Sequence, residues 1–405
     1  MRFLVKGAVL LIIVLMTACD KGYEHDRYSS YGVDHDKSVL YDNVDALQSQ
    51  LEALGKTPFA TLCHSMSQRL DGKDVEGNAR FVQAMMGLGN LMYNTAGEDC
   101  YFAALMDLVF DRGYYCTQLL ADGYGQWQWN EELGQFEKVK DCDDKIVFIF
   151  PSADDATAAD AVLTVSDLAF YGGVFPGKGE EQDSGQIVDQ VLERLYCNIK
   201  VGSDLLLTSN LLSTFAEDGH FKDVALTFNA GSFNLNGELE KEDREGFWRW
   251  TFSNNSARIL EHELCLRFNE HNTFMPVDDI ENKLVLKNIM AKTRARSGAV
   301  YNELEKVMQL QEGSEEYATA LAGTLNTHAI MDIRYLNYTI LARVKPIARQ
   351  QDDGSGTWYI DLEFEFSDGS RESGDIYFNN YLNYFKIELE KLVAEFENKF
   401  GVRSA

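Results

Sequence analysis

Residues 358–366 read Trp-Tyr-Ile-Asp-Leu-Glu-Phe-Glu-Phe, and this strict alternation is the clearest structural signal in the chain. Alternate residues of an extended strand point to opposite faces, so the five apolar side chains share one face and the polar ones the other. The turn-forming segment 350–356 precedes this stretch, and residues 330–344 form a second strand before the turn. We therefore predict a β-hairpin with one buried face and one wet face.

Amphipathic helices are expected at both ends of the chain. The apolar residues Leu40, Val44, Leu47, Leu51 and Leu54 follow helical spacing. Two further helices are predicted near 81–92 and 102–109, and a long helical stretch over 278–310. The chain closes with one apolar stripe over 378–400, which predicts a C-terminal helix packed on the sheet face of 358–366.

Between these helices the apolar period changes from helical spacing to two. A hairpin turn is predicted at 132–134, and 146–150 reads as a buried strand. An inserted helix is expected near 187–195. Further strands are predicted at 162–165, 197–201, 205–208, 224–228, 247–252 and 259–268.

These elements predict an α+β fold, with a mainly antiparallel sheet, a helical N-terminal region and an amphipathic C-terminal helix. The expected organisation is a signal peptide over 1–18, a flexible tether over 19–37 and a helical region over 38–123. A β-rich region over 124–275 and an α+β region over 276–405 follow.

The first nineteen residues resemble the export signal of a bacterial lipoprotein. Arg2 and Lys6 precede an uncharged apolar run over 7–16, which is too short to cross a bilayer as a helix. The segment Met16-Thr17-Ala18-Cys19 matches a lipobox, except that Met stands where Leu is usual. This resemblance implies cleavage before Cys19 and lipidation of its thiol, so that acyl chains hold the protein to a membrane of the cell envelope, facing the periplasm or the exterior.

The charge of the chain argues against several classes of partner. The formal net charge is −27, and the chain that follows the signal peptide carries −29 because the first 18 residues hold two positive charges and no acid. Such a surface repels nucleic acid and anionic lipid headgroups, so we expect no nucleic-acid partner and a membrane contact made through the lipid on Cys19.

After Cys19, six cysteines remain: Cys63, Cys100, Cys116, Cys142, Cys197 and Cys265. Export to an oxidising compartment predicts at least one disulfide among them, and buried inert thiols are the alternative. No pair has C-x-x-C spacing, which argues against a zinc ribbon or a redox motif.

Several motifs match known chemistry only in part. The segment 172–179 fits a phosphate-binding loop until its last position, where Gly179 replaces the Ser or Thr that holds magnesium. His262-Glu263 begins a zinc-protease motif, but Leu266 stands in place of the second His, and the segment is predicted to be a strand with His262 facing the core. No metal site or cofactor is therefore expected.

Two weaker features are candidate contact sites. The first is a set of tryptophans on predicted strands, Trp127, Trp129, Trp248 and Trp250, which could stack on a ligand or fill the core. The second is a basic cluster in an acidic chain, which could meet a phospholipid headgroup or an acidic partner or simply be a solvated helix face: Lys283, Lys287, Lys292, Arg294 and Arg296.

The sequence favours a non-catalytic lipoprotein that binds an apolar or amphipathic ligand or an envelope partner. One alternative is an envelope hydrolase that uses paired carboxylates on a glycan or a peptide, and another is a structural subunit of an envelope complex. No candidate catalytic residue can be named, since the separation of carboxylates is a three-dimensional quantity.

The lipobox yields a direct prediction. Cys19→Ala removes the only thiol that the lipobox presents for acylation, so the variant should be lost from the membrane fraction and should carry no lipid. Fractionation and mass spectrometry of the N-terminal peptide measure both, and an acylated, membrane-bound variant would contradict the assignment.

Overall fold

The structure is a computed structural model of the 405-residue chain. It describes residues 27–69, 78, 81, 123–153, 159–173, 188–215, 221–241, 245–268, 277–296, 303, 306–307, 309–351, 354–374 and 376–377. The predicted helices at 102–109 and 378–400 lie outside these residues, as do the signal peptide, Cys19 and, apart from Phe81, the predicted helix at 81–92.

The fold is mostly β, so the α+β prediction is wrong. Among the described residues, 55% are in strands and 23% in helices, with sixteen strands and three helices. The strands pair almost entirely with their neighbours in sequence, and the sheet is mixed because β1 and β3 pair in parallel. The chain divides into two compact units, which are described in turn: unit 1 contains 1–51 and 241–389, and unit 2 contains 52–240 and 390–405.

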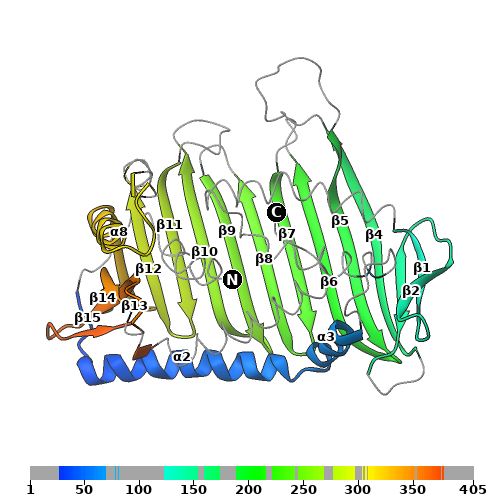
Figure 1. The fold of residues 1–405 in the computed structure, drawn as a ribbon, viewed down its shortest axis with the longest axis horizontal. Helices are drawn as coiled ribbons and strands as arrows, with labels where there is room; N and C mark the ends of the chain where they lie inside the picture. The colour runs from blue at the N-terminus through cyan, green and yellow to red at the C-terminus, as the bar shows by residue number, and fades with distance from the viewer. Residues whose placement is uncertain are drawn as a thin grey trace, which may run out of the picture. The chain divides into compact units, whose positions relative to one another are not determined.

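Unit 2 contains helix α3 (Pro58–Arg69) and the first half of the strands (Figure 1). The strands are β1 (Gly125–Asn130), β2 (Gln135–Lys140), β3 (Ile146–Phe150), β4 (Ala161–Gly173), β5 (Val188–Val201), β6 (Asp204–Phe215), β7 (Phe221–Ala230) and β8 (Phe233–Lys241). Their order is β2-β1-β3-β4-β5-β6-β7-β8.

A row of apolar side chains in register across these strands forms the core of unit 2. Each residue pairs with the next across a strand boundary, and all are buried: Trp127, Phe148, Leu163, Ile199, Leu207, Ala230 and Phe233. Residues that pair directly lie on the same face of a sheet, so one register places the whole row in the core.

Unit 1 contains most of α2 (Val33–Gly55), helix α8 (Glu315–His328) and the remaining strands. These are β9 (Glu245–Asn254), β10 (Ala257–Phe268), β11 (Val277–Leu286), β12 (Ile289–Arg296), β13 (Ala329–Tyr335), β14 (Ile340–Gln350), β15 (Trp358–Glu365) and β16 (Arg371–Ser373). They pair in sequence order, all antiparallel.

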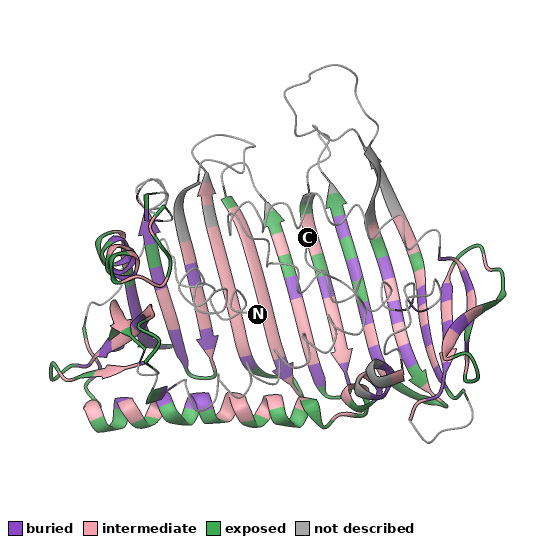
Figure 2. Cartoon of the chain, in the orientation of Figure 1, coloured by how far each residue is buried: buried purple, intermediate pink, exposed green. Residues whose placement is uncertain are grey.

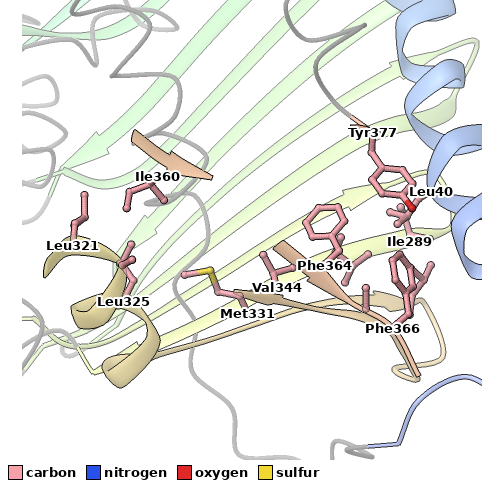
Figure 3. Close-up of a cluster of buried hydrophobic side chains, with 14 of the residues drawn as sticks. Leu40, Ile289, Leu321, Leu325, Met331, Val344, Ile360, Phe364, Phe366 and Tyr377 are labelled. Carbon is pink, nitrogen blue, oxygen red and sulfur yellow. The ribbon is translucent and has the colours of Figure 1, made fainter. Parts of the chain in front are cut away.

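Helix α8 covers β14 and β15, and the sequence analysis missed it. Its buried residues Ala318, Leu321, Ala322 and Leu325 form one stripe, and Ser314 caps its N-terminus by accepting a hydrogen bond from the backbone N–H of Tyr317. The buried residues of α8 pack with Val344, Ile360 and Phe364 in one apolar core (Figure 3). The predicted hairpin of 330–344 with 358–366 is confirmed in its second half, β14 and β15, but a turn after Tyr335 divides its first strand.

Two predicted helices are strands. Residues 188–195 of the first segment lie in β5, where register shifts in the pairing with β4 interrupt the alternation, so its apolar residues imitate helical spacing. The segment 278–310 begins with β11 and β12, joined at Lys287 and Asn288. Lys287 adopts a φ of 52°, a conformation usually held by Gly or Asn, so this turn lacks the glycine by which such turns are usually predicted.

Helix α2 runs across the ends of the unit 1 strands (Figure 1). Three polar residues spaced seven apart bond to successive chain reversals. Asp36 Oδ1 accepts from the Tyr335 hydroxyl at 2.6 Å, Asn43 Oδ1 accepts from the Asn288 N–H at 3.3 Å, and Gln50 Oε1 accepts from Asn254 Nδ2 at 2.8 Å. Seven helical residues rise about 10.5 Å, close to the roughly 9.6 Å occupied by two adjacent strands. The helix therefore stays in register with the hairpin ends.

Asn43 tests this arrangement. It is 2% exposed, and its Nδ2 also donates to the Val39 carbonyl at 2.7 Å. Asn43→Ala removes a buried side chain that makes two hydrogen bonds, one to the Asn288 N–H and one to the Val39 carbonyl, so the free energy of unfolding should fall by about 1–3 kcal/mol. The exposed neighbour Asp42 is the control: Asp42→Ala should change urea unfolding by less than about 0.5 kcal/mol, and equal effects would contradict the role of Asn43.

Candidate functional site

The strands β9–β13 of unit 1 present two chemically different faces. Strand β9 illustrates the division: Trp248, Trp250 and Phe252 lie on one face, and Phe247 and Arg249 on the other. The antiparallel register carries this division across the neighbouring strands, because directly paired residues share a face. The faces are called here the apolar face and the charged face.

The apolar face consists of rows that start at the β9 aromatics. Trp248 pairs with Leu264, which pairs with Asn282, and Trp250 pairs with His262, which pairs with Leu284. The indole rings of Trp248 and Trp250 lie 5.2 Å apart between centroids and are tilted by 55°. Both tryptophans are only half-buried, as is all of β9 between Gly246 and Phe252 (Figure 2).

His262 lies in the middle of this face, on strand β10, as the sequence predicted. Its side chain hydrogen-bonds to that of Asn282, and Nε2 has no hydrogen-bond partner among the described residues. Burial lowers the pKa of His262 to about 4, and the bond to Asn282 only partly opposes this effect. The imidazole is therefore neutral near pH 7.

The opposite face carries an unbroken row of ionisable side chains. Each pairs directly with the next, across β9 to β16: Arg249, Glu263, Lys283, Lys292, Asp332, Arg343, Glu365 and Arg371. Glu263 accepts from Arg249 Nε at 3.1 Å and from Lys283 Nζ at 2.8 Å. Burial alone would raise the pKa of Glu263, but these two cations lower it.

Part of the predicted basic cluster belongs to this row of charges. Lys283, Lys292, Arg294 and Arg296 lie on β11 and β12, not on a helix, and Lys287 is in the turn between them. Lys292 Nζ lies 3.6 Å from Glu281, which pairs with Arg294, and Arg296 pairs with Asp279. Lys283 pairs directly with Lys292, but each also lies beside a carboxylate, Glu263 and Glu281 respectively, so their positive charge is largely neutralised within the sheet.

The four candidate tryptophans divide into two pairs. Trp127 and Trp129 are 6% and 8% exposed and pack in the unit 2 core, where Trp129 contacts Phe136 and Trp127 contacts Phe148. Phe136 and Phe148 in turn enclose Phe81. Trp127 and Trp129 therefore fill the core and are not ligand contacts. Of the four candidates, only Trp248 and Trp250 remain available for contact.

The described carboxylates give no support to hydrolysis by a carboxylate pair. A glycosidase general acid needs a raised pKa. In the part of the chain that the structure describes, the carboxyls with perturbed pKa values are shifted downward: Asp141, Asp160, Glu263, Glu365, Asp368 and Glu372. No cluster of three or more His, Cys, Asp or Glu suited to a metal occurs among the same residues.

Four of the six cysteines lie in the described residues. Cys63, Cys142 and Cys197 are free thiols, and burial raises the pKa of Cys197. Cys265 lies in β10, whereas Cys100 and Cys116 lie outside the described residues. The loop over 174–179 lies outside them as well.

The described chain begins on the body of unit 1. Arg27 C=O accepts from the Ile340 N–H at 3.0 Å, and the Ser29 N–H donates to Ile340 C=O at 2.7 Å, so Tyr28 forms a parallel bridge at the start of β14. Ser29 Oγ donates to buried Asp36 at 2.7 Å. Residues 27–37, which were expected in a flexible tether, thus belong to the body, and α2 begins at Val33.

The comparisons with known proteins give no relative. No family model matches the sequence, no curated protein is similar to it, and no solved structure matches the fold. In the described residues, no helix is long and apolar enough to cross a membrane.

His262 generates a pH prediction. Its pKa in the folded state, about 4, lies below the value of 6.5 expected in the unfolded chain. Above pH 6.5 the group is neutral in both states. As the pH falls from 6.5 to 4 the unfolded chain takes up a proton first, so the folded state loses up to about 3 kcal/mol.

Replacing the imidazole should remove this contribution. His262→Leu should lose less stability than the parent between pH 7.5 and 4.5, measured by urea unfolding at each pH. Exposed His35 provides the control, since His35→Leu should retain the parent's pH dependence. Identical pH profiles for the parent and His262→Leu would contradict the buried, neutral assignment.

Proposed function

We propose that this protein is a lipid-anchored lipoprotein of the bacterial cell envelope that binds an apolar or amphipathic ligand on the apolar face of unit 1. The observation that carries the proposal is the half-buried pair Trp248 and Trp250 on a sheet face whose neighbouring rows are mainly apolar. Anchoring through Cys19 is supported by the lipobox.

The chemistry of the face favours an apolar ligand over a sugar or an anion. Trp248 and Trp250 provide adjacent ring surfaces, and Leu264 and Leu284 continue the apolar surface on β10 and β11. Their polar neighbours on this face, His262 and Asn282, are neutral and bonded to each other, so the face offers few of the hydrogen-bonding groups that sugar sites combine with aromatic stacking.

The charged face is a poor candidate for the same role. Its cations and carboxylates already satisfy each other, as in the contacts of Glu263 with Arg249 and Lys283. A charged ligand would have to break these contacts before it bound. Unpaired apolar surface offers the larger gain, since burial of each Å² contributes about 25 cal/mol.

Titration with a fluorescent long-chain fatty acid tests the proposal. Trp248→Ala and Trp250→Ala should each raise the Kd about 30-fold, corresponding to roughly 2 kcal/mol for an aromatic side chain at the centre of a contact. Phe247→Ala is the matched control, because Phe247 lies on the same strand but on the charged face. Its Kd should stay within about twofold of the parent's.

Two results would count against the proposal. The first is the absence of saturable fatty-acid binding by the parent protein. The second is an equal loss of binding in Trp248→Ala and Phe247→Ala, which would indicate damage to the sheet. Circular dichroism of each variant establishes whether the strands remain intact.

A further inference from the structure

A small patch of exposed apolar side chains lies where the chain enters the body of unit 1. Tyr31, Leu336 and Tyr338 are 59%, 39% and 46% exposed. Leu336 and Tyr338 belong to the turn between β13 and β14, and Tyr31 packs edge-on against Tyr335, 5.4 Å between ring centroids. These three residues are called here the entry patch.

The turn holds Tyr338 in a conformation that its side chain disfavours. The loop Leu336-Asn337-Tyr338 closes with a bond from the Tyr338 N–H to the Tyr335 carbonyl at 2.9 Å, and Tyr338 has a φ of 69°. Three-residue hairpin loops usually place Gly at this left-handed position, and a bulky residue there costs free energy. A strained tyrosine whose ring is exposed points to a function of that ring outside the fold.

The chain that precedes the body is short. Arg27 is bonded to Ile340, two residues after Tyr338, and Arg27 is only eight positions after Cys19. Eight residue steps span at most about 29 Å. An acyl anchor on Cys19 would therefore hold the entry patch close to the bilayer surface.

The composition of the patch suits the interface of a bilayer. Tyrosine is enriched at membrane interfaces, where its ring contacts apolar groups and its hydroxyl remains hydrated. The turn 336–339 itself contains no acidic residue, although the mature chain carries −29, so this turn lacks the carboxylates that anionic headgroups repel.

We propose that the entry patch is a membrane-contact surface: Tyr31, Leu336 and Tyr338 rest in the interface of the bilayer that holds the lipidated Cys19. This inference rests on the anchoring part of the proposed function. It adds an orientation, with the β13–β14 turn facing the membrane.

Hydrogen exchange on the lipidated protein tests the contact. The full lipidated chain is reconstituted on phosphatidylcholine vesicles and compared with the unlipidated Cys19→Ser protein in solution. Amides of residues 335–340 should exchange on the order of tenfold more slowly on vesicles. The β9–β10 turn, 254–257, should exchange at the same rate in both samples.

Variants separate the side chains from the anchor. The double variant Leu336→Ser with Tyr338→Asn should remain on vesicles but lose the slow exchange at 335–340. Leu205→Ser is the matched control, because Leu205 is 52% exposed at the start of β6 in unit 2, and it should retain the slow exchange. Tyr338→Asn alone should raise the thermal midpoint, because Asn tolerates the left-handed conformation.

Each outcome has a distinct meaning. Vesicle-bound protein with unchanged exchange at 335–340 overturns the contact and leaves the anchor intact. Slow exchange that persists in the double variant also overturns the contact. Slow exchange in the unlipidated protein at raised concentration would indicate self-association and would overturn it as well. Failure of the protein to bind vesicles at all refutes the anchor, and the proposed contact with it.

Discussion

In-register pairing of antiparallel strands is the constraint on which the rest of this structure depends. A shift of one residue would move every side chain of a strand to the other face. In unit 2 the register places an apolar row, from Trp127 to Phe233, in the core. In unit 1 it assembles a row of charges, from Arg249 to Arg371, in which opposite charges mostly alternate. Both rows specify the register because a slip would bury charge or expose apolar area.

Helix α2 adds a second, independent measure of the same register. Its bonds at Asp36, Asn43 and Gln50 fall on every second strand boundary, because two strand spacings nearly equal two helical turns. Asp36 is fully buried. The pKa of the Tyr335 hydroxyl is raised by its own burial and by its hydrogen bond to Asp36. The helix thus fixes the hairpin ends while Leu40 and Val44 contribute to the apolar core.

The same organisation separates three surfaces of unit 1 by chemistry. The charged face is neutralised by its own pairs, the apolar face keeps Trp248 and Trp250 half-buried, and the turn after β13 displays Tyr338. The chemistry of each surface is set by which side chains of the strand or turn point outward. A ligand-binding face and a membrane-facing end are compatible, because different parts of the sheet carry them.

The sequence by itself determined the strands whose alternation is uninterrupted, such as 146–150 and 358–365, and the amphipathic start of α2. It also placed His262 on a strand facing apolar neighbours. It misjudged β5, where bulges break the two-residue period, and β11–β12, where Lys287 occupies a turn position that usually signals itself by Gly. Local pattern cannot reveal such cases, since pairing with neighbouring strands decides them. Only the tertiary structure decided that Trp127 and Trp129 are core whereas Trp248 and Trp250 are half-buried, because burial depends on what packs against a face and not on which residues form it.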